Sequence, residues 1–189
     1  QGEIRIGGIM MKNEKIVEIA TKEGFADAAI IDTADIVFDA SFRPYCEENL
    51  CGWYGANYSC PPDCGTPEEM KERVQKHKHA LVLRTVWDIN DFKDSSLIKS
   101  AKQKHNAYTM SVIEQMEKEG HMGFMVGASG CALCNPCLII EGKTCKFPNK
   151  RYSCMSAYCI YVKDLAEKCG MIYDYKEGAL PFFSMYVYD

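Results

Sequence analysis

Hydrophobic residues near the start of the chain change from helical to extended spacing. In "KNEKIVEIATKEG" an apolar stripe runs from Ile16 to Ala20, and Gly24 follows it as a common helix stop. The next segment, "AAIIDTADIVFD", holds two short apolar runs at residues 28–31 and 36–38. These runs predict two strands, or one strand with an extension, so the pattern opens with a helix followed by extended chain.

The middle of the chain carries stronger helix and strand signals. In "TPEEMKERV", Thr66 precedes a proline and stands three residues before a glutamate, which predicts a capping box at a helix start. The continuous apolar run "ALVLRTVW" is typical of a buried strand. Residues 91–120 have a helical apolar stripe that includes His105, which we expect to be a hydrogen-bonded core residue rather than a ligand. "GFMVGASG", from Gly123, predicts a further strand.

The C-terminal part of the chain continues this alternation. Apolar residues recur at helical spacing over residues 154–170, which places Cys159 and Cys169 in the core or on a helix face. The runs "MIYDY" and "FFSMYVYD" predict a closing pair of strands. Alternating helices and strands predict an α/β fold: a mixed sheet with helices packed on it and two cysteine-rich metal-binding loops at its edge or end.

Composition and charge narrow the class of protein. The chain has 189 residues; we expect an N-terminal arm or artificial remnant over residues 1–11 and a single α/β metal-binding domain over residues 12–189. No apolar run approaches the roughly 20 residues that cross a bilayer. A formal net charge of -4 supplies no basic surface for nucleic acid. The first residues lack a secretory signal, so we expect a cytoplasmic protein.

The chain contains eleven cysteines, an odd number that cannot pair completely within one molecule. Disulfides are rare in the reducing cytosol, so metal ligation explains cysteines set among Gly, Pro and Asn better than disulfide pairing does. Some of the eleven are expected to be ordinary core residues, because a free cysteine packs well as a small apolar side chain.

One group of cysteines lies in "GCALCNPCLIIEGKTCKFP" and combines three thiols at CxxC steps with a fourth after seven residues. A run of three closely spaced thiols wraps a short loop around one compact centre, as in ferredoxin-type iron–sulfur sites. Four-cysteine zinc sites are usually built from two separated CxxC pairs, so the spacing favours an iron–sulfur cluster over zinc. The ligands expected here are Cys131, Cys134, Cys137 and Cys145.

A second set of cysteines lies between Arg43 and Gly65, in a non-periodic segment that predicts an ordered loop. Its gaps follow no single motif, but Pro61 and Pro62 restrict the backbone beside it. The aromatic residues of "GWYGANY" either shield a cluster from water or simply pack, and the sequence leaves both readings open. The ligands expected here are Cys46, Cys51, Cys60 and Cys64.

Three other metal-ligating side chains receive ordinary interpretations. Cys154 lies near neither run in spacing, so we expect a spare or core thiol there rather than a ninth ligand. His77 and His79 stand beside lysines at a predicted helix end, where a solvated cationic cap is the default interpretation.

The segments "CGWYGANYSCPP", "TPEEM", "HALVLRT", "GASGCALCNPC", "CKFP" and "MSAY" together resemble an uncharacterised prokaryotic family of predicted metal-binding proteins, a domain of unknown function. The resemblance covers most of the chain from Lys12 onward. It gives Cys64 no firm place in the family pattern and expects small non-cysteine residues at positions 154 and 159. It implies metal or iron–sulfur binding through Cys46, Cys51, Cys60, Cys131, Cys134, Cys137 and Cys145.

These observations lead to one leading function and two alternatives. The leading function is binding of one or two iron–sulfur clusters, with 4Fe-4S as the leading type, for electron transfer to or from a redox enzyme partner. The first alternative is a structural or interaction module in which zinc staples the cysteine loops. The second is a cluster-dependent enzyme in which an open iron binds substrate.

Overall fold

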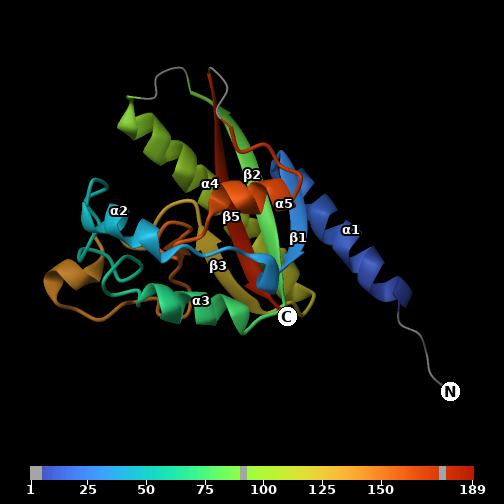
Figure 1. Cartoon of the computed structure of the whole chain (residues 1–189), viewed down its shortest axis with the longest axis horizontal. Helices are drawn as coiled ribbons and strands as arrows, with labels where there is room; N and C mark the ends of the chain where they lie inside the picture. The colour runs from blue at the N-terminus through green and yellow to red at the C-terminus, as the bar shows by residue number, and fades with distance from the viewer. Residues whose placement is uncertain (1–5, 90–92, 175–177) are drawn as a thin grey trace.

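The computed structural model describes residues 6–89, 93–174 and 178–189, with side chains described from Asn13 onward (Figure 1). Short 3-10 helices cover Thr33–Asp35, Ala40–Phe42 and Leu138–Glu141. The described α-helices are α1 (Ile6–Glu23), α2 (Arg43–Glu47), α3 (Pro67–Gln75), α4 (Ser95–Lys118) and α5 (Val162–Lys168). The described strands are β1 (Asp27–Asp32), β2 (His79–Asp88), β3 (Gly123–Gly127), β4 (Ser153–Cys154) and β5 (Ala179–Tyr188).

The strands form one mixed sheet in the order β1-β2-β5-β3-β4. β5 pairs antiparallel with β2 and β3, while β3 and β4 are parallel. β5 occupies the centre of the sheet, and all but its first residue are buried, because helices cover both faces. The α/β fold with a mixed sheet, predicted from the alternating pattern, is therefore confirmed.

Helices α1 and α4 cover one face of the sheet, whereas α3 and α5 cover the other (Figure 1). Leu81 and Leu83 of β2 pack toward α1 and α4, and the alternate residues Ala80 and Val82 pack toward α3 and α5. A continuous apolar run is what a strand buried on both faces requires, since successive side chains point to opposite sides.

Several local predictions are confirmed at atomic detail. Gly24 ends α1 with φ +106°, in the left-handed region that favours glycine. The Thr66 hydroxyl accepts a 3.2 Å bond from the Glu69 N–H, and the Glu69 carboxylate accepts a 2.9 Å bond from the Thr66 N–H, so the capping box is complete. His105 is fully buried on α4, as expected of a core histidine.

Other local predictions need correction. The helix expected over residues 154–170 covers only Val162–Lys168, because a tight turn precedes it and Cys159 takes a left-handed φ of 55°. No strand forms at residues 171–174; Tyr175, the end of the predicted "MIYDY" strand, lies outside the described residues. Of the apolar run 36–38, Phe38 makes an isolated bridge to Ile160. The loop expected over residues 43–65 begins with the short helix α2.

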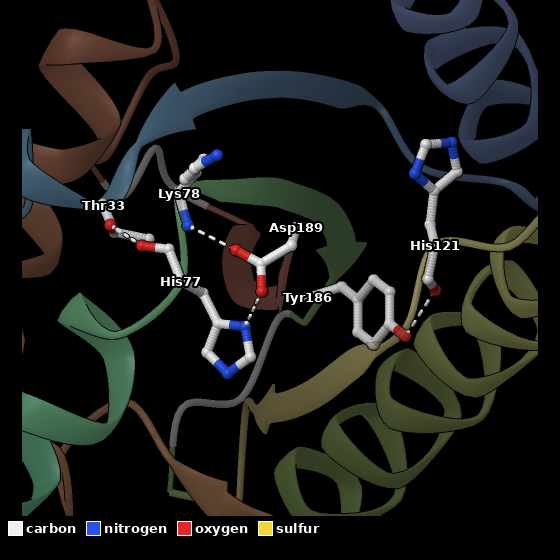
Figure 2. Close-up of polar contacts among 6 residues, drawn as sticks. All are labelled: Thr33, His77, Lys78, His121, Tyr186 and Asp189. Carbon is white, nitrogen blue, oxygen red and sulfur yellow. Dashed lines mark hydrogen bonds and ion pairs between the residues drawn. The ribbon is translucent and has the colours of Figure 1, made fainter.

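Polar contacts tie together the end of the sheet that carries the C-terminus (Figure 2). Asp189 accepts a 3.1 Å bond from the Lys78 N–H and contacts His77 Nδ1 at 3.0 Å, while His79 Nδ1 lies 3.3 Å from Asp32. The two histidines therefore contact carboxylates, which corrects the expected solvated cap. Gly123 pairs with Tyr188, so β3 runs away from this end and delivers the chain to the cysteine loop beyond Gly127.

Within the described part of the chain, none of the helices is both long and apolar enough to cross a membrane.

Candidate metal centre

The four cysteines of the second group line a single small cavity. Its wall is completed by side chains from the same loop, including Leu133 and Phe147, and by Asn57, Tyr58 and Arg151. The loop folds back because the short helix Leu138–Glu141 ends at Gly142, which has a left-handed φ of 66°. This turn brings the distant fourth cysteine to the CxxC run, and the residues that meet at the cavity are Cys131, Cys134, Cys137 and Cys145.

Helix α4 holds the start of this loop through the buried side chain of Asn106. Asn106 Oδ1 accepts a 2.8 Å bond from the Ala128 N–H, and its Nδ2 donates a 2.9 Å bond to Ser129 Oγ. The Ala132 N–H donates a 3.3 Å bond to the hydroxyl of buried Tyr152. These bonds pair polar groups of the loop beyond the end of β3. The two bonds from Asn106 attach the start of the loop, and with it the cavity, to α4.

The first cysteine loop docks directly on the second. Asn57 Nδ2 donates a 2.9 Å bond to the Cys131 carbonyl, and the Cys131 N–H donates a 2.9 Å bond to Ser59 Oγ. Gly130 also lies so close to the first loop that an added Cβ would stand 3.1 Å from Cys60 Sγ. The two cysteine groups are therefore neighbours, joined by two buried polar side chains.

Aromatic residues of the first loop pack beside the second group. Trp53 borders Gly130 and lines a cavity with Cys134. The Tyr58 hydroxyl donates a 2.9 Å bond to the Lys143 carbonyl, and its ring lies 5.8 Å from the Arg151 guanidinium. Trp53 and Tyr58 thus line the cavities beside the second group, and both readings that the sequence left open stay predictions.

The first cysteine group is spread over α2 and the turns that follow it. Cys46 is half-buried on α2, Cys51 is exposed, and Cys60 is buried. Cys64 is buried as well, but its Sγ lies 3.4 Å from Sδ of the core residue Met70. The loop turns the Cys64 thiol toward the core, and the ligand roles of Cys46, Cys51 and Cys60 stay predictions.

Burial and the Arg43 guanidinium act in opposite directions on the pKa of two thiols of the first group, Cys46 and Cys64. Burial raises the pKa of Cys46 and of Cys64 to about 11, and the Arg43 guanidinium lowers both values. Burial raises the pKa of Cys60 further, to about 12. These thiols are protonated at neutral pH without a metal, so any metal that binds them releases protons.

The Arg43 side chain also holds the first group to the sheet. It donates 2.9 Å bonds to the Gly65 and Ala157 carbonyls, which lie at the end of the cysteine loop and in the turn after β4. A single cation therefore lies beside several thiols and links the segments that carry them, a position that favours thiolate charge.

No three His, Cys, Asp or Glu side chains stand close enough to hold one metal ion, among residues 13–89, 93–174 and 178–189. Thiolates on one zinc ion, at about 2.3 Å each, lie roughly 4 Å from one another. All eleven cysteines are free thiols, so no disulfide accounts for the groups.

A larger cavity of about 310 Å³ opens beside the second group, between α4 and the CxxC run. Lys99 and Gln103 of α4 form one wall, and Cys134 and Asn135 form the other. Its volume falls in the range of small-molecule sites.

The fold and the site define the class of this protein: an α/β domain whose two cysteine-rich loops dock on each other at one end of a mixed sheet. A family profile described as "Predicted metal-binding protein (DUF2284)", a domain of unknown function, matches residues 29–187, and the chain belongs to this family. The resemblance drawn from the sequence is thereby confirmed. Neither a curated protein nor a solved structure gives a significant match.

Sequence reasoning did not single out the polar residues that assemble the site. Asn57, Ser59 and Asn106 are each about 1 % exposed, and each satisfies loop backbone or polar groups. Their only signal is their residue type, since Asn and Ser in loops commonly bond nearby backbone. Arg43 was used only as the boundary of a loop, although its guanidinium lowers the pKa of Cys46 and of Cys64.

Proposed function

We propose that this protein binds two iron–sulfur clusters of the 4Fe-4S type and transfers electrons between them and an enzyme partner. The observation that carries the proposal is the meeting of all four cysteines of the second group at one cavity, beside the first group. The family description supports the coarser statement, that a metal is bound.

The donor set fits a cluster better than a single ion. Four thiols face one cavity, yet no three are as close as one zinc ion would require. A cubane cluster carries its four thiolates on four separate irons, which spaces them farther apart than the ligands of one ion. When bound, such a group supplies one-electron redox chemistry.

The surrounding residues have definite roles under this proposal. Leu133 and Phe147 exclude water from the sulfurs, and the buried bonds of Asn57 and Ser59 fix the backbone of Cys131. Burial and hydrogen bonding are the features by which a protein tunes a cluster's potential. No acid or base is required for electron transfer, and besides the thiols the cavity is lined by Leu133, Phe147, Asn57, Tyr58 and Arg151.

The surface beside the second group favours an acidic partner. Between positions 143 and 151 the chain has four exposed basic residues: Lys143, Lys146, Lys150 and Arg151. Lys143 forms an ion pair with Glu141, so three of the four charges are left for a partner to meet. A basic rim next to a redox site steers a negatively charged partner to the shortest electron path.

The decisive experiment measures iron and acid-labile sulfide after anaerobic purification. We expect both in near-equal amounts, with visible absorption that bleaches on dithionite reduction. Cys131→Ser, Cys134→Ser and Cys137→Ser should each lower iron content and loosen the local fold, because ligand binding contributes folding free energy. Unchanged iron in all three variants, or a colourless protein with stoichiometric zinc, would refute the proposal and support the zinc module instead.

The 310 Å³ cavity beside Cys134 favours a second candidate function, a cluster-dependent enzyme. Lys99 offers a cation, Gln103 and Asn135 offer amides, and Trp53 offers an aromatic wall. These groups suit a small planar organic anion bound against the second group.

Electron paramagnetic resonance of the reduced protein tests this candidate with benzoate as the probe. A bound anion should change the cluster signal, and Lys99→Ala should remove the change while iron content stays constant. Lys118→Ala, near the far end of the same helix, is the matched control. A signal that benzoate leaves unchanged at every concentration would count against a binding site for aromatic carboxylates.

A further inference from the structure

An exposed apolar surface lies next to the first cysteine loop. Tyr45 on α2 is 67 % exposed, and Tyr161, the residue before α5, is 42 % exposed. The ring of Phe42 joins them, because its centroid lies 6.4 Å from that of Tyr45 and 5.8 Å from that of Tyr161. The Tyr161 N–H also donates a 2.9 Å bond to the carbonyl of exposed Val37. These four residues form one continuous surface, which we call the aromatic face.

The aromatic face has an acidic rim on its α2 side. Glu47 and Glu48 are exposed, and from residue 44 to residue 70 the chain has no basic residue. Arg43 directs its guanidinium inward, to two backbone carbonyls. Lys163, two positions after Tyr161, is exposed and leaves the acidic charge on the α2 side. A contiguous apolar patch with a charged rim is typical of a protein-binding surface, and this one fits a partner with an apolar centre and a basic rim.

The second cysteine loop of the same chain carries such a surface. Ile140, in the short helix after the CxxC run, is 57 % exposed. Lys143 and Arg151 both contact Tyr58, so the two ends of the basic segment 143–151 lie close together. We call this surface the basic face, and its exposed residues are Ile140, Lys143, Lys146, Lys150 and Arg151.

Both faces lie at the same end of the molecule. The two cysteine loops are docked on each other, and both extend to the left of the sheet in Figure 1. Two faces of opposite charge at one end of a molecule suit pairing around a two-fold axis, because each face of one copy then meets the opposite face of the other. Such a pair makes the same contact twice and so buries the apolar centres of both copies.

We propose that two copies of this chain associate, with the aromatic face of each copy against the basic face of the other. Burial of the apolar centres supplies affinity, and the opposite charges of the two rims set the orientation. The contact uses residues outside the expected ligand set, so it goes beyond the proposed function. The enzyme partner is proposed to meet the same basic residues, and self-association therefore competes with enzyme binding.

The test measures the mass of the anaerobically purified full chain by sedimentation velocity over a range of concentration and salt. The native chain should form pairs that dissociate several-fold more readily at high salt, because salt shortens the range of charge attraction. Two charge-reversed chains, Glu47→Lys with Glu48→Lys and Lys146→Glu with Lys150→Glu, should each be monomeric where the native chain is paired.

Glu114→Lys with Glu117→Lys, at exposed positions near the far end of α4, is the matched control, because it changes the net charge as much as the first variant does. This control should pair as the native chain does.

An equal mixture of the two charge-reversed chains gives the sharpest result. In the mixed pair each reversed face meets a face of opposite charge, so the mixture should regain the mass of a pair although neither chain pairs alone. A mixture that stays monomeric would overturn the proposal, as would a native chain that is monomeric at every concentration or variants that pair as well as the control. Should a double variant fail to fold, Glu48→Lys mixed with Lys150→Glu decides by the same criterion. Iron content does not enter these outcomes, so loss of the proposed function would leave the pairing test intact.

Discussion

At the scale of single residues, His105 shows how a polar side chain is accommodated in the core. Its Nδ1 lies 2.7 Å from Thr85 Oγ1, which also accepts a 2.7 Å bond from Trp87 Nε1. The hydroxyl and Nδ1 share one hydrogen bond, and the ring tautomer sets which of the two atoms donates. Nε2 is buried without a hydrogen-bond partner, so the position suits a neutral ring.

Burial lowers the pKa of His105 to about 3, which predicts a pH dependence of stability. Above pH ~6.5 both the folded and the unfolded chain hold a neutral ring. Below it the unfolded chain binds a proton that the folded chain does not, so stability falls as pH falls toward 3, by about 2 kcal/mol at pH 5. His105→Gln has no titrating ring at this position and so lacks this loss. The difference in melting temperature between the native chain and the variant should therefore shrink as pH falls from 7 to 5.

Thermal melting of both chains, followed in iron-free protein, checks this prediction without interference from acid loss of a cluster. His77→Gln provides a control, because the ring of His77 is partly exposed and lies against Asp189. Parallel curves of melting temperature against pH for the native chain and His105→Gln would contradict it.

At the scale of elements, the capping box of α3 follows directly from local sequence. Thr66→Ala removes the acceptor of the Glu69 N–H bond and should lower the free energy of unfolding by about 1 kcal/mol. In a chain of this size that corresponds to a melting temperature lower by roughly 2–4 °C. Iron content should stay constant, because the cap lies beyond the proposed ligands. Calorimetry measures the effect, with Ser100→Ala, at an exposed position within α4, as the control. Equal melting temperatures of Thr66→Ala and Ser100→Ala would contradict the prediction.

The contact between the two cysteine loops gives a second prediction at this scale. In Gly130→Ala the added Cβ would stand 3.1 Å from Cys60 Sγ and 3.2 Å from Ser59 Oγ, tighter than ordinary contact. Relief of this crowding shifts Cys60 and Ser59 by a few tenths of an ångström, at a cost of about 1–3 kcal/mol. We expect iron to be released to a chelator several-fold faster. Ala132→Gly, which adds freedom but no bulk to the same loop, should show a smaller change, and equal release rates would argue against the docked arrangement.

The same elements show what could be predicted from the sequence. The cap at Thr66 and the strand at residues 80–87 depend on neighbouring residues, so local pattern sufficed. The helix expected around Cys159 failed because helical spacing of apolar residues also fits a turn in which most side chains are buried. Pairing between distant segments leaves no periodic signal, and this is why the short strand β4, which pairs with β3, was missed.

At the scale of the whole molecule, the polar contacts of Asp189 and the cysteine-rich loops lie at different places on the sheet. Asp189, which follows β5, contacts His77 and Lys78 in the segment before β2. β3 begins at the same end of the sheet, where Gly123 pairs with Tyr188. The cysteine loops extend from the C-terminal end of β3 and from the segment between β1 and α3 (Figure 1). A rigid sheet core therefore supports loops whose own order depends on side-chain bonds and, under the proposed function, on metal.

The nearness of the two cysteine groups predicts that two clusters would interact magnetically. Asn57 and Ser59 bond the backbone of Cys131, and Gly130 borders Cys60. The two cysteine groups are therefore in direct contact. In the fully reduced protein, unpaired electrons on two such clusters should split and broaden the resonance spectrum. Cys134→Ser, which removes one cluster, should leave a simple, unsplit signal. A fully reduced native chain whose spectrum equals the sum of two isolated signals would contradict the close placement of the clusters, while leaving their presence intact.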